Sequence, residues 1–138
     1  MKKILSYIFL LFLTTEATAQ NVETDRSFRT GKLPNGLTYY IRHNAKEAGL
    51  ADFYIAQRVG SILEEPRQRG LAHFLEHMAF NGTQNFRDTP KSPSIVHWCE
   101  AHGIKFGTNL NAYTSVDETV YHVGAVPVRN NSTVDSTL

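Results

Sequence analysis

The sequence predicts an α+β fold in which an antiparallel sheet carries helices packed on one face. Apolar residues make up 41% of the 138 residues, which is ordinary for a globular protein. Some segments alternate apolar and polar residues with the period of two that strands show, and others repeat apolar residues with the helical period. Strands are expected at 37–42, 52–59, 109–115 and 119–123, and helices at 70–81 and 93–102.

The first 19 residues have the three-part layout of a secretory signal peptide. Lys2 and Lys3 form a basic start, an apolar run follows from Ile4 to Leu13, and Ala17-Thr18-Ala19 supplies small residues for cleavage. A membrane anchor is the alternative, but a spanning helix needs about 20 apolar residues. Cleavage after Ala19 would leave a domain at 20–138, exported to a periplasm or the extracellular space and free of the membrane.

The charges of the chain nearly cancel, with 14 Lys and Arg against 13 Asp and Glu. No basic field is therefore expected to attract nucleic acid or an anionic membrane surface. Cys99 is the single cysteine, so an intramolecular disulfide is excluded. Its place beside Trp98 in the second predicted helix favours a buried structural thiol over a nucleophile.

The first strands are separated by turn and loop signals. Residues 20–32 are polar and aperiodic, which is typical of an irregular N-terminal arm. The next four residues, 33–36, read Leu-Pro-Asn-Gly, a turn in which Pro restricts one dihedral and Gly accepts a positive φ. The segments 37–42 and 52–59 are then expected to pair with each other as antiparallel strands across a polar loop.

The helix expected at 70–81 is amphipathic. Gly82 stands where a C-terminal cap is expected. Leu71, Phe74, Leu75 and Met78 gather on one side, which is expected to pack into the core. The opposite side carries His73, Glu76 and His77 and is expected to face a cleft, since positions i, i+3 and i+4 share a helix face.

The rest of the chain contains three further signals. Ser92-Pro93 is expected to begin the second helix, and Gly103 to end it. A hairpin is expected around 116–118. Ser132 with Asp135 fits a capping box at the start of another helix, which leaves about one turn before Leu138. We therefore expect the domain to be truncated at its C-terminus.

The order His73-x-x-Glu76-His77 is the inverzincin signature of zinc peptidases. Hydrolysis at zinc needs three protein ligands, an open position for water and a base beside that water. Two His one helical turn apart can both point a ring nitrogen at Zn²⁺, and Glu76 lies on the same face as general base. The alternative is a surface helix whose His and Glu merely face solvent.

Four blocks of the sequence, in order, resemble the pitrilysin (insulinase) family of metallopeptidases. They are Leu33–Leu37, Val59–Glu65 with Gly70–Thr83, Phe106–Ser115, and Glu118–Tyr121. The resemblance implies a pitrilysin-like N-terminal domain and the hydrolysis of peptide bonds in a peptide or protein substrate. It also implies that His73 and His77 are zinc ligands and that Glu76 is the catalytic base. Asn111 and Ala112 match an edge-strand position where the family holds the substrate backbone, while a purely local role is the alternative for Asn111.

Two parts of the family's active site are not matched within this chain. The family's third zinc ligand is a Glu on a later helix, expected beyond Leu138, and a second related domain or subunit closes the chamber. No substitute ligand is assigned from the acidic and His residues at 100, 102, 117, 118 and 122. Two alternatives to an active peptidase stay open: a non-catalytic pitrilysin-like subunit, and an inactive fragment that lacks the third ligand.

Overall fold

The computed structural model describes residue 23 and residues 25–138, so the signal segment expected at 1–19 lies outside the described residues. The chain divides into two compact units, Met1–Ala45 and Lys46–Leu138. Within the described part of the chain, no helix has the length and apolar character that a membrane span requires.

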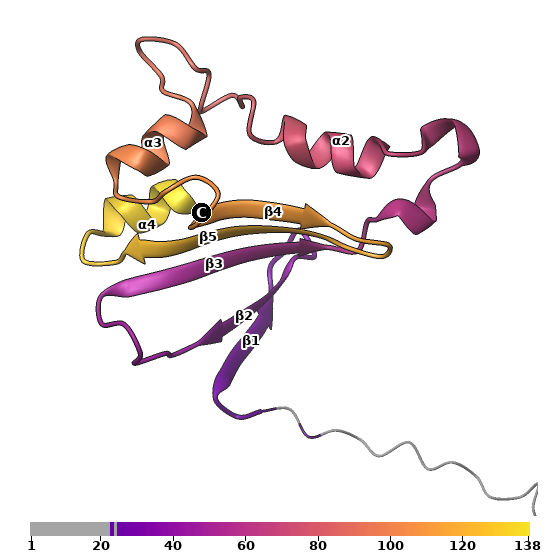
Figure 1. Ribbon diagram of the computed structural model, residues 1–138. Coiled ribbons are helices and arrows are strands. Elements are labelled where there is room, and N and C mark those ends of the chain that lie inside the picture. The colour runs from indigo at the N-terminus through magenta and orange to yellow at the C-terminus, as the bar shows by residue number, and fades with distance from the viewer. Residues whose placement is uncertain (1–22, 24) are drawn as a thin grey trace, which may run out of the picture. The chain divides into compact units, whose positions relative to one another are not determined.

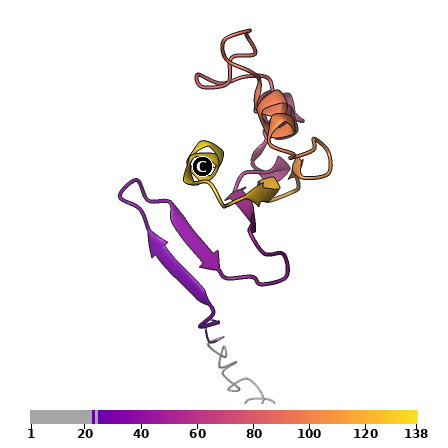
Figure 2. The ribbon, with the colours of Figure 1, turned by 90° about the vertical axis from the view of Figure 1, so that its left-hand side faces the viewer.

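The first unit contains a β-hairpin. Strands β1 (Phe28–Lys32) and β2 (Thr38–Arg42) pair antiparallel and form a two-stranded ribbon (Figure 2). The predicted turn at 33–36 joins them: the Leu33 N–H donates to the Leu37 carbonyl at 2.8 Å. Gly36 has a φ of +91°, the left-handed conformation for which Gly is suited.

Two expectations about these strands are wrong. Residues 28–32 are a strand rather than part of an irregular arm, and β2 pairs with this strand rather than with 52–59. The alternation in 28–32 is weak because Gly31 has no side chain. Gly31 pairs with Tyr39, whose ring lies where a Cβ on Gly31 would be. Residues 28–32 therefore form a strand because they pair with β2 across the turn, and a period-two pattern does not reveal such pairing.

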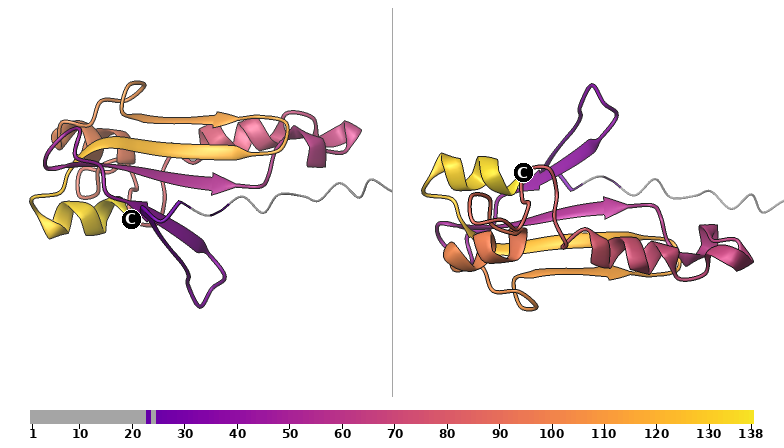
Figure 3. Two further views of the ribbon diagram at one scale, coloured as in Figure 1. Left: turned by 90° about the horizontal axis from the view of Figure 1, so that it is seen from below. Right: turned by 90° about the horizontal axis from the view of Figure 1, so that it is seen from above.

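The second unit is built on a three-stranded antiparallel sheet with the order β3-β5-β4. Strand β5 (Thr119–Pro127) lies between β3 (Leu50–Gln57) and β4 (Leu110–Thr114), as Figure 3 shows. The predicted hairpin around 116–118 joins β4 to β5 and is confirmed. Within the three strands of this sheet, β4 is an edge strand whose outer side has no neighbouring strand.

Helices α2 (Leu71–Met78) and α3 (Ile95–Ala101) lie over one face of this sheet (Figure 1). Both predicted helices are confirmed, with shorter bounds. Two short 3-10 turns, η1 (Ser61–Leu63) and η2 (Pro66–Gln68), lead from β3 to α2. The α+β class with helices on a sheet face is thus the architecture observed.

The helix caps differ from those expected. The Ser94 side chain, not that of Ser92, caps α3 by accepting a hydrogen bond from the His97 N–H at 3.2 Å. Helix α4 (Asn131–Thr137) is capped by Asn130 rather than Ser132, because the Asn130 side chain accepts the Ser132 N–H at 3.0 Å. In both cases the capping side chain belongs to the residue immediately before the first helical one.

The core of the second unit lies between α3 and the sheet. Cys99, Ile104, Leu110 and Val126 are buried together. Partly buried apolar side chains, among them Phe53, Phe80, Trp98 and Val123, pack around them. Cys99 is thus buried, as predicted.

The expectation for the two sides of α2 is wrong in one respect. Its apolar side is exposed: Phe74 and Leu75 have 58% and 61% of their surface accessible. Glu76 on the polar side is 5% exposed. Hydrophobic periodicity identified the two sides correctly, but the side that meets the sheet is the one with Glu76, whose carboxylate accepts a hydrogen bond from Thr114 on β4.

Candidate metal centre

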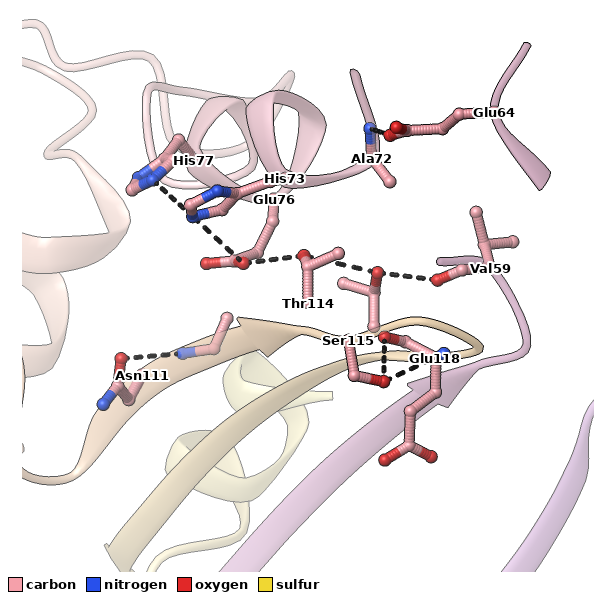
Figure 4. Close-up of polar contacts among 12 residues, drawn as sticks. Val59, Glu64, Ala72, His73, Glu76, His77, Asn111, Thr114, Ser115 and Glu118 are labelled. Carbon is pink, nitrogen blue, oxygen red and sulfur yellow. Dashed lines mark hydrogen bonds and ion pairs between the residues drawn. The ribbon is translucent and has the colours of Figure 1, made fainter. Parts of the chain in front are cut away.

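The two histidines of α2 point their rings at the same place. The Nε2 atoms of His73 and His77 are 3.0 Å apart, and their ring centroids are 4.6 Å apart (Figure 4). Zinc bonded to two imidazoles at about 2.0–2.1 Å in tetrahedral geometry would place the nitrogens roughly 3.3 Å apart. The observed separation and the donor type therefore fit a shared zinc ion.

The Glu76 carboxylate lies beside this pair. Its Oε2 is 4.0 Å from the His73 Nε2, and it accepts a hydrogen bond from the Thr114 hydroxyl at 2.7 Å. Glu76 and His73 are close because they lie three residues apart on one helix, whereas Thr114 reaches Glu76 from strand β4 of the sheet. A buried carboxylate is costly without hydrogen bonds, and Thr114 supplies one.

The start of α2 is held by a residue to which sequence reasoning assigned no chemistry. The Glu64 carboxylate accepts hydrogen bonds from the main-chain N–H groups of Gly70 and Ala72, at 2.7 and 2.8 Å. Both bonds lower the pKa of Glu64, and the bond from Ala72 has the larger effect. Its place in a motif block was the only signal that could have identified it.

A second threonine lies behind Thr114. Thr119 is the cross-strand partner of Thr114, and its hydroxyl donates to the Val59 carbonyl at 2.8 Å and lies 3.4 Å from the Thr114 Oγ1. Sequence reasoning missed both threonines: each lies in one of the blocks that resemble the family, but nothing else distinguishes them from other strand threonines. The pKa of Tyr121 is raised, mainly by burial and to a smaller extent by the Glu76 charge.

Asn111 and Ala112 lie on the edge strand β4, and the described contacts of the Asn111 side chain are local. Its Oδ1 accepts the Ala112 N–H at 2.9 Å, and its Nδ2 donates to the Gly107 carbonyl at 3.4 Å. In the pairing with β5, Ala112 lies opposite Tyr121. The Ala112 N–H is thus directed to its neighbour's side chain and away from β5.

Two other histidines each lie beside one aspartate, away from this site. His97 is 3.6 Å from Asp88 in the loop before α3, and His122 is 3.9 Å from Asp52 on the sheet. Within residue 23 and residues 25–138, no group of three or more His, Cys, Asp or Glu is arranged to hold a metal ion. The described residues therefore bring together two candidate ligands, His73 and His77.

Comparison with known proteins places residues 40–136 in the family described as insulinase (peptidase family M16). A probable zinc protease, PqqL of Escherichia coli, is 37% identical over 120 residues. That match covers 87% of this chain and 12% of the relative. A zinc protease PQQL-like of Arabidopsis thaliana is 45% identical over 98 residues, which cover 71% of this chain and 10% of the relative.

A solved structure has the same fold. The first half of the periplasmic protease PqqL from Escherichia coli matches with a TM-score of 0.75 and 36% identity. The match covers 84% of this chain and 24% of that chain. The present chain thus spans about an eighth of the full-length relatives, and the domain matched is part of a larger molecule there.

Proposed function

The chain belongs to the insulinase family, peptidase family M16, and from this membership we propose that it carries part of the active site of a zinc metalloendopeptidase. The observation that carries the proposal is the convergence of the His73 and His77 ring nitrogens, 3.0 Å apart, beside the buried Glu76 carboxylate. The names of the relatives, zinc proteases, support it.

His73 and His77 would hold the zinc ion through their Nε2 atoms. A zinc ion held there would supply Lewis-acid chemistry that polarises a peptide carbonyl and makes water more acidic. Glu76 would take the proton from the attacking water and deliver it to the leaving amine. Its position one residue before His77 keeps the carboxylate on the same helix face as both ligands.

We further propose that the substrate adds to β4 as a strand. In an antiparallel ladder, the main-chain groups of alternate residues face the partner and the open edge in turn. Residues 109 and 115 of this segment bond to the β5 side, through the Asn109 carbonyl and the Ser115 N–H. Counting in twos from either of them, residues 111 and 113 also face β5. The main-chain groups of Ala112 therefore face the open edge. Main-chain hydrogen bonds there would hold an extended peptide, and Asn111 would release the Ala112 N–H to it.

The parts that complete the enzyme would come from the rest of a longer polypeptide. Hydrolytic zinc sites use three protein ligands, and two are at hand here. Because this chain spans about an eighth of its relatives, we propose that a third ligand, a Glu, and a second related domain lie outside these 138 residues. A non-catalytic subunit is the competing possibility.

We also propose that the protein is exported. The layout of residues 1–19 supports this, and the Escherichia coli relative is described as periplasmic. Sequencing the N-terminus of the protein recovered from its cells is expected to start at Gln20. An N-terminus that retains Lys2 and Lys3 would contradict export by this signal.

The activity is tested by Glu76→Gln in the full-length protein that contains this chain. Glutamine keeps the shape of the side chain but cannot act as a base, so turnover of a peptide substrate should fall by about 10²-fold or more, as for loss of a general base. Zinc content, measured by atomic emission, should stay the same.

The matched control is Glu100→Gln, the same change on the exposed side of α3. It should leave both turnover and zinc content unchanged. Near-normal turnover of the Glu76→Gln protein would remove Glu76 from the mechanism, and a wild-type protein that binds zinc without cleaving any peptide would favour the non-catalytic subunit.

The strand-addition proposal is tested with peptides N-methylated at one residue after another. Each methyl group removes one N–H donor, so KM should rise at alternate substrate positions, those whose N–H faces β4. Uniform KM values along the series would contradict strand addition.

A further inference from the structure

The buried Glu76 carboxylate is held by a side chain that has no role in the mechanism proposed above. Thr114 on β4 donates a hydrogen bond from its hydroxyl to the Glu76 Oε2 at 2.7 Å (Figure 4). We propose that Thr114, supported by Thr119, is a positioning residue that sets the orientation of Glu76 as the general base. This inference rests on the proposed function.

The direction of the hydrogen bonds follows from the chemistry of the groups. An ionised carboxylate can only accept, so the Thr114 hydroxyl proton must point at Glu76. Thr119 has one hydroxyl proton, and the Val59 carbonyl at 2.8 Å is nearer to it than the Thr114 Oγ1 at 3.4 Å. Thr119 is thereby fixed on Val59, and it packs against Thr114 as its cross-strand partner.

Two features restrict how far these hydroxyls can move. Threonine is branched at Cβ, which restricts rotation of its side chain. The hairpin after Thr114 is joined to the segment that leads into α2: the Ser61 N–H donates to the Ser115 carbonyl at 3.1 Å, and the Ile62 N–H to the Val116 carbonyl at 2.8 Å. The strand that bears the donor and the chain that enters the catalytic helix are thus tied together.

The consequence for Glu76 is that its two oxygens have different environments. Oε2 is tied to Thr114 and lies 4.0 Å from the His73 Nε2, while Oε1 accepts no hydrogen bond from the described residues. With Oε2 held, the carboxylate cannot rotate freely, and Oε1 is left to receive a proton. Thr114 would therefore affect the chemical step more than substrate binding, since misplacing a base by even a small distance costs rate.

The test compares Thr114→Val with Thr114→Ser in the full-length protein. Valine keeps the branched shape and removes the hydroxyl, so kcat should fall about tenfold or more, a part of the 10²–10⁴-fold that a general base provides. KM for a peptide and zinc content should stay within about twofold of the wild type. Serine retains the donor and should restore kcat to within about threefold of the wild type.

A matched control and a double variant separate positioning from general stability. Thr30→Val removes the hydroxyl of an exposed strand threonine on β1 and should not change kcat. In a Glu76→Gln background, Thr114→Val should lower the residual rate no further, because its effect passes through Glu76. If Thr114 had only a structural role, Thr114→Val would lower the rate by the same factor in the wild-type and the Glu76→Gln backgrounds.

The outcomes distinguish this inference from the proposed function. If Glu76→Gln abolishes turnover while Thr114→Val leaves kcat unchanged, or if Thr114→Ser loses as much as Thr114→Val, the positioning role is wrong and the zinc peptidase stands. If Glu76→Gln itself leaves turnover near normal, both the positioning role of Thr114 and the base role of Glu76 are wrong. Should Thr114→Val fail to fold, Thr114→Ala also removes the hydroxyl and takes its place, with the same fall in kcat expected and an unchanged kcat contradicting the positioning role.

Discussion

The Glu64 carboxylate accepts a hydrogen bond from the main-chain N–H of Ala72 at 2.8 Å, across eight residues of sequence. Its other oxygen accepts the Gly70 N–H at 2.7 Å. The first N–H groups of a helix have no partner within the helix, and a negative charge is favoured near them. Glu64 therefore acts on α2 as an N-cap side chain does on other helices. The bond to Ala72 lies one residue before His73, the first proposed zinc ligand.

Removal of this cap should loosen the first turn of α2. In Glu64→Ala, amide hydrogen exchange at Gly70 and Ala72 is expected to be roughly tenfold faster, since local opening becomes easier. The control is Glu65→Ala, which removes a neighbouring carboxylate that pairs with Arg67 at 3.1 Å instead. Unchanged exchange in Glu64→Ala, or equal acceleration in both variants, would contradict the cap.

The same contacts predict a dependence of stability on pH. The pKa of Glu64 is lowered in the folded protein, because the Ala72 and Gly70 N–H groups favour the charged form. The stabilisation is complete above the unfolded pKa and is lost as pH falls through the folded one. Between about pH 6 and about pH 3, the wild type should lose more free energy of unfolding than Glu64→Gln, measured by urea titration. Parallel curves would rule out this linkage.

Gly60 should not tolerate a side chain. A Cβ there would lie 2.5 Å from the Val116 carbonyl oxygen and 2.6 Å from that of Ser115. Gly60→Ala is expected to cost about 1–3 kcal/mol of unfolding free energy, as overpacking does, because the hairpin must move away from the chain that enters α2. Ser61→Ala, at the next and exposed position, should cost less than about 0.5 kcal/mol. Equal stability of the two variants would show that this close approach is absent in solution.

The Cys99 thiol should be unreactive in the folded protein. It is 1% exposed, and burial, with a smaller contribution from the Glu100 charge, raises its pKa to about 11. Thiolate is the reactive form, so at neutral pH Cys99 lacks both charge and access. Labelling with a thiol reagent should be slow until denaturant is added, and then go to completion. Rapid labelling under native conditions would show that the core around α3 opens.

The 138-residue chain should bind zinc weakly. His73 and His77 are the two proposed ligands that the described residues bring together, so the binding free energy should be well below the roughly 10–16 kcal/mol of complete structural sites. Titration followed by calorimetry should show a weak event that His77→Ala removes and His97→Ala leaves unchanged. Tight binding of one zinc ion per chain would contradict this prediction, because it would mean that two protein ligands and solvent are enough to hold the ion.

Much of the fold could be predicted because its signals are local. The alternation in 37–42 and 52–59 identified two strands, the turn at 33–36 was correct, and Gly103 follows α3 with a φ of +79°. The pairing of these strands could not be predicted, because period two tells which residues share a face and not which strand lies beside which. The sequence alone determined the placement of His73, Glu76 and His77 on one side of one helix, since that follows from 3.6 residues per turn.

Only the tertiary structure decided what surrounds that helix. Thr114 lies 38 residues beyond Glu76 in sequence, yet it donates to its carboxylate, and Glu64 caps α2 from the preceding turn. The exposed Phe74 and the buried Glu76 reverse the burial that hydrophobicity favours. The physical reason is that burial and hydrogen bonding depend on which distant segments meet, and here the sheet presents a donor to the polar side of α2.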